Sequence, residues 1–144
     1  MEVIRDEYAT YKTIFFRKST RFKVVETLVF IILLVVLIGL VDTSSTEFKV
    51  GALGLGALTL GLSPLLYMLV VRPRHILTSN ELIIERFGKQ RAVALTSVEE
   101  TYDLRFFYKI EGKKMPLMIS DGFINDLDQK IEEIKKTQQK KMTK

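Results

Sequence analysis

The residues that could carry out chemistry in this 144-residue chain are few, and none is spaced as in a known catalytic or metal site. The single histidine, His75, follows Arg74, and a neighbouring cation disfavours a bound metal ion. Acidic residues gather in one stretch of the second half: Glu99, Glu100, Asp103 and Glu111. They lack the spacing of a metal-binding loop, so we interpret them as a solvated face. We predict no catalytic residue, metal, cofactor or small-molecule substrate, and we expect the protein not to be an enzyme.

Basic residues offer a stronger basis for binding, because the chain carries a net charge of +5. Several of them flank a long apolar region, where each could contribute about 1 kcal/mol of attraction to anionic lipid headgroups. These candidate lipid-surface residues are Arg17, Lys18, Arg21, Lys23, Arg72 and Arg74. No base-stacking strand can be distinguished from core, so we expect no nucleic-acid partner.

Two apolar segments must position these charges. Residues 24–41 carry one acidic residue, Glu26, and residues 50–71 carry no charge. As helices they would reach about 27 Å and about 33 Å, against a hydrocarbon core of about 30 Å. We therefore predict a transmembrane helical hairpin over residues 24–71, with an outside loop at residues 42–49. Glu26 lies about one turn inside its span, where it can reach the headgroups, and we assign it no role.

Lysine and arginine are concentrated outside both ends of the hairpin, and the connecting loop has a single cation, Lys49. The positive-inside rule then places both termini in the cytoplasm, with the chain crossing the membrane twice. Residues 1–23 alternate basic and aromatic side chains, and four of the apolar ones recur at helical spacing: Ile4, Tyr8, Tyr11 and Phe15. We favour a cytoplasmic interfacial segment lying on the lipid surface. An ordinary basic flank and a strand added to the later domain are the alternatives.

The second span is rich in small residues, and we predict that some of them pack helices closely. The predicted helix-packing residues are Gly54, Gly56, Ala57 and Gly61. The first span of the same chain is the simplest partner, and a second copy or another membrane protein is the alternative. Pro64 can kink this helix, since it removes a backbone donor.

Beyond the hairpin the pattern changes to short alternating strands followed by one helix. Strands are predicted within residues 82–87, 91–95, 98–102, 104–110 and 115–119. A helix capped by Asp121 would bury Ile124, Leu127, Ile131 and Ile134 and turn Asp126, Asp128, Glu132 and Glu133 outward. We predict a cytoplasmic α+β domain over residues 72–136, and a basic flexible tail over residues 137–144.

The stretch ILTSNELIIERFGKQRAVALTSV resembles the opening hairpin of bacterial PH-like domains. The residues that carry the resemblance are Thr78, Leu82, Ile84, Gly88, Val93, Leu95 and Val98. Domains of this kind often follow a two-helix hairpin in small membrane proteins of Gram-positive bacteria, including the EbsA-like group. The resemblance implies a curved antiparallel sheet closed by a C-terminal helix, with a binding or scaffolding role and no catalytic residue.

Together with these patterns, the resemblance implies a membrane-anchored, non-enzymatic binding or scaffold protein of the bacterial cell (inner) membrane. Its PH-like module would meet a membrane-protein partner, another copy of the chain or anionic lipid of the bilayer. The alternative prediction is an immunity protein that protects against a membrane-active bacteriocin or toxin.

Overall fold

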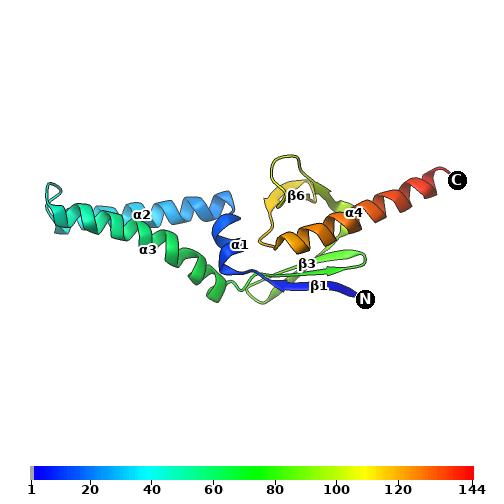
Figure 1. Ribbon diagram of the computed structural model, residues 1–144, viewed down its shortest axis with the longest axis horizontal. Helices are drawn as coiled ribbons and strands as arrows, with labels where there is room; N and C mark the ends of the chain where they lie inside the picture. Colours follow the sequence, from blue (N-terminus) through cyan, green and yellow to red (C-terminus); the bar gives the residue numbers. More distant parts are fainter. Residues whose placement is uncertain (1) are drawn as a thin grey trace.

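Two long helices form one end of the molecule in the computed structural model, which describes residues 2–144 (Figure 1). Helix α2 covers Thr20–Leu40 and helix α3 covers Thr46–Val70, and both are long and apolar enough to cross a membrane. Each helix begins before the apolar run that predicted it, because a serine caps it. Ser19 and Ser45 accept hydrogen bonds from backbone N–H groups of the first turns. The predicted pair of long helices is confirmed.

Two antiparallel sheets and a C-terminal helix form the other end. The first sheet has the order β1-β2-β3-β4, from Val3–Tyr8, Arg74–Thr78, Glu81–Arg86 and Lys89–Ala94. A short 3₁₀ turn, Leu95–Ser97, leads to the second sheet, β5-β6-β7, from Val98–Glu100, Phe107–Ile110 and Lys113–Pro116. Helix α4, Asp121–Met142, lies between the sheets in Figure 1, and one core cluster joins residues of both sheets to it. The α+β class is confirmed, with two small sheets in place of one continuous curved sheet.

The helical hairpin is inserted between two neighbouring strands of one sheet. Strands β1 and β2 pair antiparallel, with Tyr8 opposite Arg74, although all of α1, α2 and α3 lies between them in sequence. The prediction of an interfacial segment is therefore wrong for Val3–Tyr8, and the alternative of a strand added to the later domain holds there. Met1 lies outside the described residues. The domain thus includes residues from both sides of the hairpin.

The helical spacing of apolar residues in the N-terminal segment does not correspond to a helix over Val3–Tyr8, because strand β1 packs on the domain through polar side chains. Arg5 and Glu7 are its partly buried residues, whereas Ile4 and Tyr8 are exposed. The guanidinium of Arg5 donates to the Asp126 carboxylate at 2.6 Å. Asp126, predicted to point outward from α4 into solvent, therefore pairs with β1. Glu7 accepts hydrogen bonds from the backbone N–H and hydroxyl of Ser120 at 2.8 Å and 2.7 Å.

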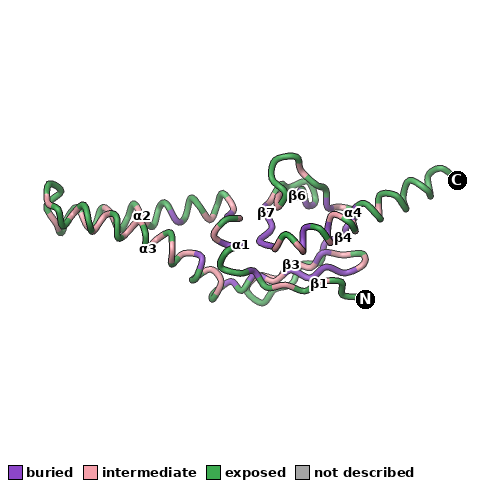
Figure 2. The backbone as a smooth tube through the Cα atoms, in the orientation of Figure 1, coloured by how far each residue is buried: buried purple, intermediate pink, exposed green. Residues whose placement is uncertain are grey.

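The domain core is apolar and continuous, as Figure 2 shows by the buried residues gathered around α4. Its fully buried members include Leu82, Tyr108, Phe123, Leu127 and Ile131. By contrast, most residues of α2 and α3 are exposed in the isolated chain.

Two hairpin turns are tighter than the sequence indicated. Phe87 and Gly88 have φ of 54° and 72°, and Glu111 and Gly112 have φ of 51° and 81°. Two consecutive positive φ values are typical of the two-residue type I′ turn, whose twist matches that of the flanking strands. Strands β4 and β7 therefore begin at Lys89 and Lys113, earlier than predicted.

Helix α4 differs from its prediction at both ends. Its N-cap is Ser120, whose side chain accepts a hydrogen bond from the Phe123 N–H, and Asp121 lies in the first turn. The helix continues to Met142, so the predicted flexible tail is helical over most of its length. The side chain of Asp128 is partly buried and accepts a hydrogen bond from the Tyr108 hydroxyl at 2.6 Å, which corrects its outward placement.

His75 is buried in β2, with 1 % of its surface exposed and its ring 6.3 Å from that of Phe123. Neither ring nitrogen has a hydrogen-bond partner among the described residues. Burial, with a smaller effect of the Arg86 charge, lowers the pKa of His75 from 6.5 to about 3. Between these values the unfolded chain binds a proton that the folded chain does not.

Stability should therefore fall as the pH drops below about 6.5, by up to about 1.4 kcal/mol per pH unit from this group. We expect His75→Leu to lessen the loss of thermal stability between pH 7 and pH 5, measured by circular dichroism of the full chain in detergent micelles. An unchanged pH dependence in the variant would show that His75 is not buried as a neutral ring.

Candidate functional site at the junction of hairpin and domain

A buried ion pair joins three elements where the hairpin meets the domain. The Lys18 amine lies 2.8 Å from both carboxylate oxygens of Glu26, and their side chains are 6 % and 8 % exposed. The hydroxyl of Ser63 donates to the same carboxylate at 2.6 Å. Lys18 precedes α2, Glu26 lies in α2 and Ser63 lies in α3, so the cluster ties both long helices to the segment before them.

Aromatic rings complete the surroundings of the Lys18 amine, which lies 4.9 Å from the Phe15 ring centre and 5.4 Å from that of Phe22. Cation–π contacts of this kind stabilise an ammonium group that is removed from bulk water. Two predictions are corrected here. Lys18, predicted to contact lipid, is buried and pairs with Glu26. Glu26, to which no role was assigned, is the partner of Lys18 and Ser63. A carboxylate inside an apolar span was the signal, because such groups are usually paired or functional.

Helix α1, Tyr11–Phe16, packs against the base of α3. Its Ile14 is fully buried in a small cluster with Ala9 and Met118, beside Tyr67 of α3. The Tyr11 hydroxyl donates to the Gly61 carbonyl at 2.8 Å, in the turn before Pro64.

Arg17 connects α1 to the sheet domain. Its guanidinium donates to the Ile119 carbonyl and to the Asp121 carboxylate, and lies 5.1 Å from the Phe106 ring centre. This contact lowers the pKa of Asp121. The predicted lipid role of Arg17 is therefore corrected to a contact between α1 and the domain.

Arg74, on the other connection between hairpin and domain, also has protein partners, and its lipid contact stays a prediction. It donates to both carboxylate oxygens of Asp6, lies 3.7 Å from Glu85 and stacks 5.1 Å from the Tyr8 ring centre. The bond to Arg74 lowers the pKa of Asp6. The remaining predicted residues, Arg21, Lys23 and Arg72, are exposed, and their lipid contact stays a prediction.

The predicted helix-packing residues divide between two faces of α3. A Cβ atom at Gly56 would lie 3.6 Å from Phe30 of α2, and one at Gly61 would lie 3.9 Å from Tyr11. Gly54 has nothing within 4 Å, and both it and Ala57 are exposed. At Gly51, outside the predicted set, a Cβ atom would lie 3.4 Å from Leu37 of α2.

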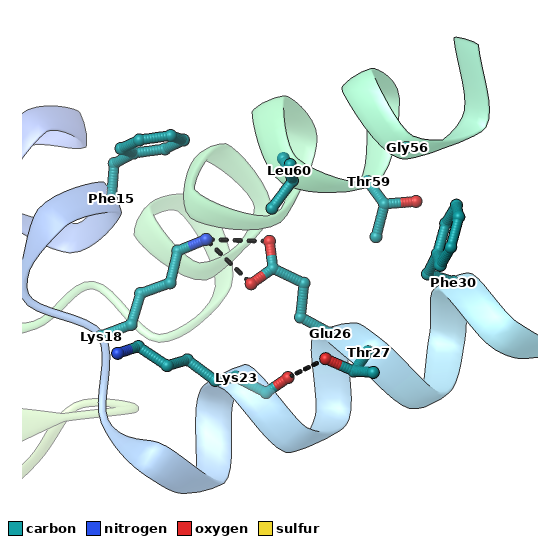
Figure 3. A pocket seen from close by; sticks show the side chains of 9 residues that line it. All are labelled: Phe15, Lys18, Lys23, Glu26, Thr27, Phe30, Gly56, Thr59 and Leu60. Carbon is teal, nitrogen blue, oxygen red and sulfur yellow. Dashed lines mark hydrogen bonds and ion pairs between the residues drawn. The ribbon is translucent and has the colours of Figure 1, made fainter. Parts of the chain in front are cut away.

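A groove of about 580 Å³ opens beside the ion pair, between α2 and α3 (Figure 3). Lys18 and Lys23 lie toward one end, Phe30 and Gly56 lie toward the other, and Glu26 and Leu60 lie between them. Its volume lies within the usual range of ligand sites, about 300–1,000 Å³.

Among residues 2–144, no group of three or more potential metal-ligating side chains gathers at this groove or elsewhere. No protein-family model matches the chain, and neither a curated protein nor a solved structure matches it.

Proposed function

We propose that the protein is a membrane-anchored binding or scaffold protein that holds a PH-like module in a fixed orientation at the bilayer. Its partner would be another membrane protein or a second copy, with anionic lipid as a further contact of the module. Both long helices expose apolar side chains over most of their length, which supports insertion into lipid.

The observation that carries the proposal is the double connection between hairpin and domain. Since the hairpin is inserted between β1 and β2, two chain segments cross the junction. Backbone hydrogen bonds hold these segments, from Ala9 to Pro73 and from Phe87 to Val71, both at 2.8 Å. Arg17 and the buried ion pair of Lys18 and Glu26 add side-chain contacts. A module that only needed tethering would require neither the second crossing nor these contacts.

The domain architecture supports the PH-like part of the proposal. Sheets of four and three antiparallel strands enclose a C-terminal helix, and the hairpin over residues 78–98 that carries the resemblance supplies strands β3 and β4. The added strand β1 extends this sheet on the side of β2.

The topology can be tested with single cysteines, because the chain has none. We expect an impermeant maleimide to label Thr43→Cys in intact cells, and to label Gln138→Cys only after lysis. Both positions are exposed, so accessibility differs only by the side of the membrane. Labelling of Gln138→Cys in intact cells would contradict a cytoplasmic domain.

The scaffold function can be tested by purification of the full chain in two mild detergents, with masses measured by light scattering. We expect a complex of defined stoichiometry, containing a second membrane protein or a second copy. A variant with flexible glycine–serine insertions after Ala9 and after Val71 should keep both parts folded but lose the complex. A monomeric native chain in both detergents would contradict the proposal.

A further inference from the structure

The charged side chains of the groove between α2 and α3 gather toward the domain, with the Phe15 ring beside them, and Phe30 and Gly56 lie farther along the helices with Thr59 (Figure 3). Phe30 lies seven positions after Lys23 in α2, which corresponds to about 10 Å along the helix. In a membrane this direction runs from the headgroup region into the hydrocarbon. The gradient therefore matches a molecule with a polar head and an apolar chain, lying parallel to the spans.

The charges at the polar end leave one unpaired cation. The carboxylate of Glu26 is occupied by Lys18 and Ser63. The exposed Lys23 forms no ion pair with any carboxylate among residues 2–144, and Figure 3 shows its amine at the same end of the groove as that of Lys18. This end therefore carries a net positive charge and favours an anionic head.

The apolar end exists because α3 presents a glycine there. Gly56 faces the Phe30 ring, and Leu60 follows one turn later on the same side of α3. A larger side chain at residue 56 would fill the space between the helices. The opening between them is therefore set by this residue and not only by the splay of the two helices.

We propose that this groove binds one anionic phospholipid, with its phosphate at Lys23 and an acyl chain along Phe30, Gly56 and Leu60. The lipid belongs to the leaflet on the side of the sheet domain, because Lys23 lies at that end of α2. The proposal rests on the membrane insertion proposed above and adds a specific site to it. Bound there, the lipid would contact the segment that carries Lys18 and connect the hairpin to the bilayer at the junction.

A tryptophan reporter can test this site, because the chain contains no tryptophan. Phe30→Trp places the reporter in the groove, with Leu60→Trp as a second reporter if the first does not fold. Leu58→Trp is the matched control, since Leu58 is 57 % exposed and lines no part of the groove. Each full-length variant is reconstituted into vesicles that contain phosphatidylcholine and phosphatidylglycerol, with bromine on the acyl chains of one or the other.

We expect brominated phosphatidylglycerol to quench the groove reporter with an affinity about fivefold above that of brominated phosphatidylcholine. The control reporter should show no such preference. Lys23→Gln should remove the preference, whereas Arg21→Gln, outside the groove lining, should retain most of it. Gly56→Leu should weaken quenching of the Leu60→Trp reporter, and Gly54→Leu on the exposed face should not.

Equal quenching by the two lipids at both reporter positions would overturn the site while leaving membrane insertion intact. Absence of quenching at the groove reporters alone would also overturn the site, whereas absence at the Leu58→Trp control as well would contradict insertion itself and overturn both proposals.

Discussion

Glu26→Ala should destabilise the full chain by about 3–5 kcal/mol, because it leaves the buried Lys18 ammonium without its counter-ion. The Lys18 and Glu26 side chains are 6 % and 8 % exposed, so the ammonium depends on this carboxylate rather than on bulk water for a partner. Ser63 would lose its hydrogen-bond acceptor as well. The expected result is a lower thermal unfolding midpoint in detergent micelles, together with earlier protease cleavage of the segment between β1 and α2.

A double variant separates the cost of an unpaired charge from the value of the pair. Replacing Lys18 by Met and Glu26 by Leu together removes both charges and keeps apolar volume, so we expect stability close to that of the native chain. Ser63→Ala should cost only about 1 kcal/mol, as the carboxylate keeps its amine partner. If Glu26→Ala were as stable as the double variant, the ion pair would not be buried in solution.

The two long helices and the core face of α4 could be predicted because each depends on a periodic apolar pattern. Leu127 and Ile131 recur at helical spacing, and both are buried. The spans were longer than any strand and almost free of charge. These features are local, so one sequence is enough to read them.

The role of β1 could not be predicted in the same way, because its inward side chains are Arg5 and Glu7. Their partners, Asp126 and Ser120, lie more than a hundred residues away, and no local pattern marks such a pairing. Ile4 and Tyr8 therefore have the spacing of one helical face, although in the structure they are exposed residues of a strand.

The candidate site was missed for a related reason. The distance of a flanking charge from the apolar spans does not distinguish the exposed Lys23 from the buried Lys18. The difference arises from the segment between α1 and α2, which directs Lys18 toward Glu26 (Figure 3). Glu26 is evident in the sequence, and an acid within an apolar span indicates a basic or polar partner nearby.

Leu127→Ala or Ile131→Ala should make the sheet domain sensitive to protease, while insertion of α2 and α3 survives. Both side chains are almost fully buried between the sheets, and each truncation typically costs about 2–5 kcal/mol. That is a large part of the roughly 5–15 kcal/mol that holds a typical domain together. Limited proteolysis of membranes that contain the full chain would show rapid loss of the C-terminal domain and a protected hairpin fragment.

Asp128→Ala should also destabilise the domain, by about 1–3 kcal/mol, although Asp128 lies outside the apolar face of α4. It accepts a hydrogen bond from the buried Tyr108 hydroxyl, whose pKa is raised by burial and then by this bond, so the phenol stays protonated and donates. Adding Tyr108→Phe to Asp128→Ala should restore part of the stability, because no buried hydroxyl is then left without a partner. Gln129→Ala, an exposed neighbour on the same helix, is the neutral control. If Asp128→Ala resisted protease as well as Gln129→Ala, the bond to Tyr108 would contribute nothing to the closure of the sheets by α4.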